Sequence, residues 1–123
     1  MPLTFVFDET SLHGSIRSAI TQHNQQSRYQ IDCVWIGDSG WPLGLKDDEL
    51  LKRAETAKRI VISSDVSTLP LHLEEHLETG GHSPGILFLR EPVTISDLVE
   101  YLSLVAHCSE PEEWADRAAF VPA

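Results

Sequence analysis

The stretch RIVISSDV, residues 59–66, decides the fold of this chain. Residues 60–62 form a short, uninterrupted β-branched run, which is typical of a strand buried on both faces of a parallel sheet. The run ends in two serines and Asp65, so an acid follows the carboxyl end of this strand. In open α/β sheets, ligands bind in the crevice outside the carboxyl ends of the strands. Asp65 is therefore the first candidate site residue.

The beginning of the chain repeats this pattern. Residues 3–7 (LTFVF) form another apolar run, which stops at Asp8 and Glu9 before a helix-like segment. The carboxyl ends of parallel strands meet at one edge of a sheet, so we expect the acids that follow both strands to face one crevice. Two acids at two strand ends are the first indication of function.

The rest of the chain alternates between short apolar runs and segments with one apolar stripe at helical spacing. Further strands are expected at residues 31–36, 85–89 and, at a sheet edge, 118–121. Helices are expected at residues 9–24, 47–57, 68–78 and 94–106. This order predicts a single domain over residues 1–123, with an α/β fold of three α/β/α layers and a mostly parallel central sheet.

Composition narrows the class of protein. The chain has 123 residues and a net charge of −10, so its surface should repel nucleic-acid backbones unless cations or a basic partner mask the acids. Cys33 and Cys108 lie far apart and show no zinc or redox spacing. No apolar stretch approaches the roughly 20 residues that cross a bilayer. We expect a cytoplasmic protein with two free thiols and no membrane contact.

The acids at strand ends and at one helix start support two interpretations, which the residues alone leave open. Clustered carboxylates stay ionised together mainly when Mg²⁺ or Mn²⁺ neutralises them, and water bound to such a cation can attack a phosphodiester. Alternatively, the same acids cap helices and interact favourably with helix dipoles. The residues concerned are Asp8, Glu9, Asp47, Asp48, Glu49 and Asp65.

Several motifs in order resemble the short PIN-like domains, which are related to VapC-type toxins. The opening LTFVFDET, residues 3–10, is similar to the strand and acidic start of that family. GLKDDELLKRA (44–54) resembles its glycine, acid pair and helix, and RIVISSD (59–65) resembles its central strand and aspartate. HSPGILFLR (82–90) and EEWADRAAFVP (112–122) are similar to its last part. The resemblance covers nearly the whole chain.

The resemblance implies a PIN-like fold and a metal-dependent endoribonuclease that cuts single-stranded RNA, often as a toxin with a small antitoxin partner. It implies Mg²⁺ or Mn²⁺ as the cofactor. The implied catalytic residues are Asp8, Glu49 and Asp65. The implied metal ligands are Asp8, Glu9, Asp47, Glu49 and Asp65.

Two departures from the family pattern favour a second hypothesis. Ser67 stands where relatives commonly have a second aspartate, and Thr10 stands where the family favours asparagine. Loss of one carboxylate lowers the affinity for a cation and removes a residue that positions water. The alternative is a non-catalytic PIN-like interaction protein, which binds a small antitoxin-like partner or forms a homodimer.

A separate motif, His72-Leu-Glu-Glu-His76, matches the inverted zincin pattern H-x-x-E-H. A zinc hydrolase would need a third ligand, and the chain leaves little room for one. The same helix carries an apolar stripe that should face the core. We therefore expect the two histidines to lie toward solvent.

Overall fold

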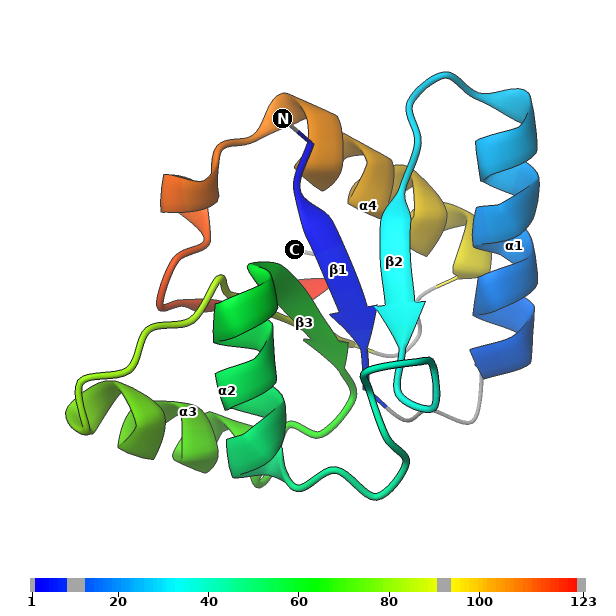
Figure 1. The fold of residues 1–123 in the computed structure, drawn as a ribbon. Helices are drawn as coiled ribbons and strands as arrows, with labels where there is room; N and C mark the ends of the chain where they lie inside the picture. The colour runs from blue at the N-terminus through cyan, green and yellow to red at the C-terminus, as the bar shows by residue number, and fades with distance from the viewer. Residues whose placement is uncertain (1, 9–12, 91–93, 122–123) are drawn as a thin grey trace.

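A computed structural model of the chain describes residues 2–8, 13–90 and 94–121 (Figure 1). The strands are β1 (Thr4–Phe7), β2 (Asp32–Trp35), β3 (Arg59–Ser63), β4 (Ile86–Leu89) and β5 (Ala118–Val121). The helices are α1 (His13–Gln26), α2 (Asp47–Ala57), α3 (Leu69–Glu78), α4 (Ile95–Cys108) and the short 3₁₀ helix η1 (Pro111–Glu113). The α/β fold with a parallel sheet and helices on both faces is confirmed.

The five strands form one parallel sheet in the order β2-β1-β3-β4-β5. The chain moves from β1 outward to β2 and then crosses back to β3 on the other side of β1. In register, Phe7 at the end of β1 lies opposite Trp35 of β2 and Ile62 of β3. This order is that of flavodoxin-like doubly wound sheets, whose topological switch point lies between β1 and β3.

Each face of the sheet has its own apolar core, because the parallel strands alternate side chains between the two faces. Helices α1 and α4 cover one face, and α2 and α3 cover the other (Figure 1). On the first face the fully buried side chains include Phe5, Phe7, Ile16, Ile62 and Leu102. On the second face they include Val6, Leu50, Leu51, Val61 and Leu69.

The last crossover differs in hand from the one before it. The chain moves in the same direction from β3 to β4 and from β4 to β5, but α3 and α4 cover opposite faces. Crossovers between parallel strands are nearly always right-handed. Because their helices lie on opposite faces, the β3–β4 and β4–β5 crossovers must have opposite hands. Phe120 of β5 is 40% exposed, and its ring contacts the Phe88 ring and the guanidinium of Arg90.

The structure confirms most of the expected core. Thr94 caps α4 by accepting a hydrogen bond from the Asp97 backbone N–H at 3.1 Å, and Leu98 and Leu102 of that helix are buried. The tail strand β5 forms at the sheet edge as expected. Within the described ranges, no helix combines the length and the apolar character needed to cross a membrane.

Candidate active site

One buried hydroxyl joins the ends of β1 and β3. Ser63, which is 3% exposed, donates a hydrogen bond from Oγ to Asp8 Oδ2 at 2.9 Å and accepts one from the Asp65 backbone N–H at 3.0 Å. The Asp8 backbone N–H donates to the Ile62 carbonyl at 2.9 Å, which extends the β1–β3 pairing beyond the strand. Ser63 therefore links the Asp8 carboxylate to the Asp65 backbone, which places these two predicted residues next to each other at the topological switch point.

The Asp65 carboxylate is held by the turn that precedes α3. Its Oδ1 accepts hydrogen bonds from the backbone N–H groups of Ser67 and Thr68 at 3.1 and 3.0 Å and from the Ser67 hydroxyl at 3.1 Å. Its Oδ2 accepts from the Thr68 hydroxyl. These bonds, with the Thr68 hydroxyl first, lower the pKa of Asp65 to about 2, because they favour the charged form. Asp65 is thus firmly ionised at neutral pH.

A third carboxylate reaches the same turn. Asp47 is the first residue of α2, and its Oδ2 lies 3.2 Å from the Thr68 hydroxyl oxygen. That hydroxyl has one hydrogen, so it can donate to Asp47 or to Asp65 but not to both at once. Two carboxylates thus converge on one donor, which leaves acceptor capacity for a cation or for water. The Nε2 atom of His72 lies 3.9 Å from Asp47 Oδ2.

The other predicted acids lie elsewhere. Glu49 is exposed and lines a shallow groove of about 530 Å³ along α2 with Trp41, Lys52 and Arg53. Asp48 is also exposed. Glu9 lies outside the described residues. Within the described ranges, no three His, Cys, Asp or Glu side chains form a group that could hold a metal ion.

The carboxyl edge thus presents one continuous chain of contacts, which runs from Asp8 through Ser63, Asp65 and Thr68 to Asp47. Carboxylate and hydroxyl oxygens are the donors that Mg²⁺ and Mn²⁺ accept. The donor types therefore suit a hard divalent cation, although the described residues do not gather three of these carboxylates around one point.

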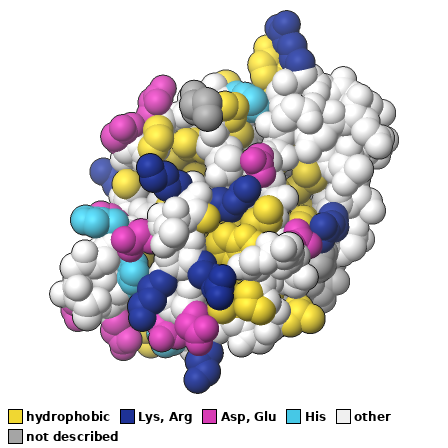
Figure 2. Space-filling view, in the orientation of Figure 1, with side chains coloured by type: hydrophobic (Ala, Val, Ile, Leu, Met, Phe, Trp, Pro, Cys, Tyr) yellow, Lys and Arg dark blue, Asp and Glu magenta, His cyan; other side chains and the backbone are white. Residues whose placement is uncertain are grey.

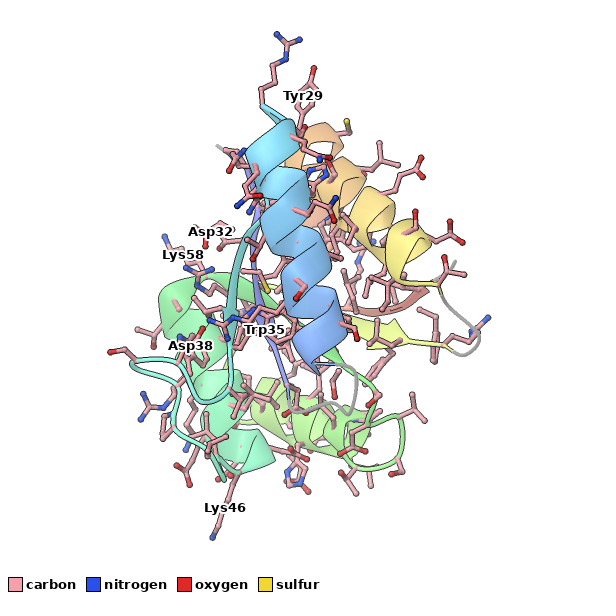
Figure 3. The ribbon with its side chains drawn as sticks, turned by 90° about the vertical axis from the view of Figure 1, so that its right-hand side faces the viewer. Tyr29, Asp32, Trp35, Asp38, Lys46 and Lys58 are labelled. Carbon is pink, nitrogen blue, oxygen red and sulfur yellow. The ribbon has the colours of Figure 1, made fainter. Side chains whose placement is uncertain are left out.

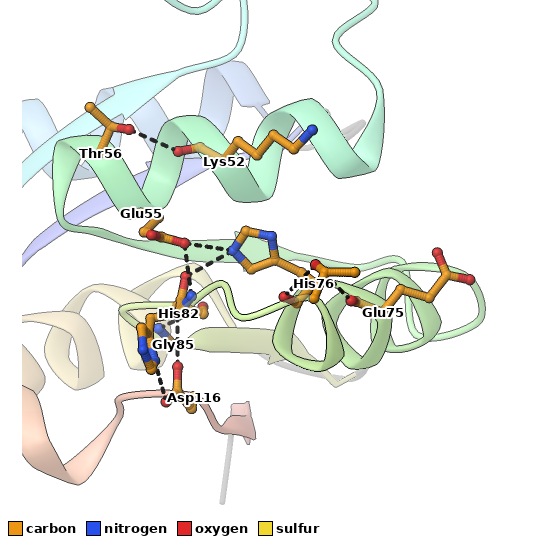
Figure 4. Close-up of polar contacts among 10 residues, drawn as sticks. Lys52, Glu55, Thr56, Glu75, His76, His82, Gly85 and Asp116 are labelled. Atoms are coloured by element: carbon orange, nitrogen blue, oxygen red, sulfur yellow. Dashed lines mark hydrogen bonds and ion pairs between the residues drawn. The ribbon is translucent and has the colours of Figure 1, made fainter.

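The histidines of the H-x-x-E-H motif have separate partners. His72 lies beside Asp47, whereas His76 Nε2 contacts Glu55 Oε1 of α2 at 2.7 Å and the His82 carbonyl at 2.9 Å (Figure 4). The His76 side chain is only 10% exposed, so the expectation that it faces solvent was wrong. The reason is that the loop after α3 folds back over it. A Cβ on Gly81 would lie 2.6 Å from the His76 ring, so only glycine fits there.

Two contributors to the site escaped the sequence prediction, namely the hydroxyls of Ser63 and Thr68. Thr68 had a local signal, because an aspartate followed by hydroxyl residues two and three positions later is typical of an Asx turn. Ser63 had no local sequence signal beyond its position at the end of a strand. Its role depends on the alignment of β1 with β3, which a single sequence does not reveal.

Comparison of the chain with protein-family models, curated proteins and solved structures found no match. The resemblance to PIN-like domains therefore stays a prediction. The function must be argued from the geometry of the site.

Proposed function

We propose that this chain is a hydrolase of phosphodiesters that depends on a divalent cation, with single-stranded RNA as the substrate. The observation that carries the proposal is the hydrogen-bonded link at the β1–β3 switch point, which runs from the Asp8 carboxylate through the Ser63 hydroxyl to the Asp65 backbone N–H. Ligands of open α/β sheets bind at this position. Ionised carboxylates at such a point favour a cationic ligand over a free anionic substrate.

Asp8, Asp65 and Asp47 are the candidates among the described residues to hold Mg²⁺ or Mn²⁺, and their side chains would have to converge on the cation, because no three of the described acids form a ready group. Glu9 and Glu49 complete the set predicted from the sequence. When bound, the cation supplies a polarised water and neutralises charge on the phosphodiester. The chain's own residues prepare this site. Hydrogen bonds from neighbouring residues already hold the candidate ligands in place, and ligands held in this way bind cations more tightly.

Neighbouring hydroxyl residues hold two of the acids, Asp8 and Asp65, in place. Ser63 fixes the orientation of Asp8 through its hydroxyl. Ser67 and Thr68 keep Asp65 charged and hold one rotamer in place. His72, beside Asp47, is placed to carry a proton near the site.

A cleavage assay tests the proposal. Labelled single-stranded RNA should be cut in Mn²⁺ by the wild type and by Asp48→Asn, whose exposed side chain lies on the same helix as Asp47. Asp8→Asn should lower the rate at least about tenfold, because a ligand is lost while the shape is kept. Ser67→Asp should raise Mn²⁺ affinity, because it adds a carboxylate beside Asp65.

A second function has an observation of its own. Both oxygens of Asp65 are occupied within the turn before α3, as expected of a residue that only stabilises a helix start. On that basis the chain would be a non-catalytic interaction protein that binds a small basic antitoxin-like partner or forms a homodimer. This function would be favoured if the wild type left the labelled RNA intact in Mn²⁺ and Asp8→Asn gave the same result in that assay.

A further inference from the structure

The opposite edge of the sheet, at the amino ends of β1 and β3, carries a second concave site. It is a cavity of about 450 Å³, within the size range of small-molecule pockets. Its walls are mostly apolar and come from four segments: the start of β1, the end of α2, the α3–β4 loop and the η1 region. Leu3, Ile60, Pro84, Pro111 and Ala115 supply the apolar surface.

The figures place this cavity away from the acidic site. Figure 3 shows Lys46 and Lys58 at opposite ends of α2, so the end of this helix that lines the cavity is remote from Asp47. Figure 2 shows hydrophobic side chains gathered between the N-terminus and α2, with Lys or Arg and also Asp or Glu side chains around them. Charges of both signs therefore surround the cavity, and Lys58 is the lysine in its lining.

Lys58 at the rim has an unusual backbone. Its φ is 57°, in the left-handed region where glycine is the default residue, and it ends α2 by donating its backbone N–H to the Glu55 carbonyl at 3.3 Å. A non-glycine residue in this region costs about 1 kcal/mol. In the described part of the chain, the Lys58 ammonium has no hydrogen-bond or ion-pair partner. A strained lysine with a free charge lies at the mouth of an apolar cavity.

Two other titratable groups line the cavity, namely His82 and Glu55. His82 pairs with Asp116 through Nδ1 at 3.1 Å, and its exposed ring leaves Nε2 without a contact among the described residues. Glu55 is already engaged, because its Oε1 accepts from the His82 backbone N–H at 2.8 Å and contacts His76 at 2.7 Å (Figure 4). These bonds, that of the His82 backbone first, lower the pKa of Glu55. The groups left to a ligand are Lys58 and His82.

We propose that this cavity binds a small amphipathic monocarboxylate, with its apolar tail against Leu3, Ile60 and Pro84 and its carboxylate on Lys58 and His82. The apolar walls select the tail, and the Lys58 ammonium, which has no partner among the described residues, selects the head beside the His82 ring. Neither the proposed hydrolysis nor its acids take part in this binding.

Calorimetric titration of the full chain with decanoate tests the proposal. Decanoate has two more CH₂ groups than octanoate, and each contributes about 0.8 kcal/mol when buried, so decanoate should bind about fifteenfold more tightly. Lys58→Gly should lower the affinity for decanoate about fivefold, because it removes one exposed ion pair. It should not lower the melting temperature, because glycine relieves the left-handed strain. Lys58→Arg, which keeps the charge, should bind like the wild type.

Three results would overturn the proposal. The first is no binding of decanoate, and the second is equal binding of decylammonium or 1-decanol, which would show that no anion is recognised. The third is self-association that covers the cavity, seen as a dimer mass that decanoate does not change. RNA cleavage should be the same in Lys58→Gly and wild type, so failure of one proposal is distinguishable from failure of the other.

Discussion

Replacing Ser63 with alanine should destabilise the fold far more than its size suggests. The buried hydroxyl makes a charge-assisted bond to Asp8 and satisfies the Asp65 backbone N–H. A hydrogen bond to a charged group contributes about 1.5–3 kcal/mol, and an unmet buried donor costs about 1–3 kcal/mol. Asp8 is only half-buried, so water recovers part of the loss. We expect Ser63→Ala to lower the free energy of unfolding by about 2 kcal/mol.

Urea denaturation followed by circular dichroism measures this change. With a slope of about 1.5 kcal/mol per molar, 2 kcal/mol shifts the midpoint by about 1.3 M. Ser64→Ala is the matched control, because Ser64 is exposed and should change stability by less than about 0.5 kcal/mol. A double-mutant cycle with Asp8→Asn should give a coupling energy of at least about 0.5 kcal/mol. Equal effects of the two alanine variants would refute the bridge.

Two further predictions concern charge and backbone. Asp65 has a folded-state pKa of about 2, below its ordinary value of 3.8, so its contribution to stability is present above about pH 4 and is lost as the pH falls toward 2. Thr68→Val should raise that pKa and weaken this acid dependence, and an NMR titration of the carboxyl carbon that shows no change would contradict the assignment. Gly85 has φ +122°, and a Cβ there would lie 2.6 Å from the Trp114 carbonyl, so Gly85→Ala should lower the free energy of unfolding by about 3 kcal/mol. Gly80→Ala, with φ +88° and open space, should cost only about 1 kcal/mol, and similar melting temperatures for both variants would exclude the close approach.

Local patterns predicted the four α-helices and five strands, because buried apolar residues recur in them at the spacing of a helix or a strand. The 3₁₀ helix η1 was not predicted. The apolar runs of β1 and β3 and the stripe of α4 lie where expected. The strand order and the differing hands of the last two crossovers depend on packing between distant segments. Helix α4 covers the α1 face instead of the α3 face, which the spacing of its apolar residues cannot reveal.

The candidate site was predictable in part, for a geometric reason. Acids that directly follow neighbouring parallel strands must lie near each other, and Asp8 and Asp65 do. In α2 the outcome depends on helix phase. Asp47 and Glu49 are two positions apart, which is a rotation of about 200° around the helix. Asp47 therefore faces Thr68 and Glu49 faces another groove.

A Mn²⁺ titration by calorimetry shows whether the edge of the sheet between β1 and β3 binds a cation. The proteins to compare are the wild type, the Asp8→Asn, Asp65→Asn double variant and the Asp48→Asn control. We expect binding in the micromolar range by the wild type and by the control, and loss of binding in the double variant. Absence of binding by the wild type, or equal binding by all three proteins, would contradict the claim that the edge between β1 and β3 is a cation site.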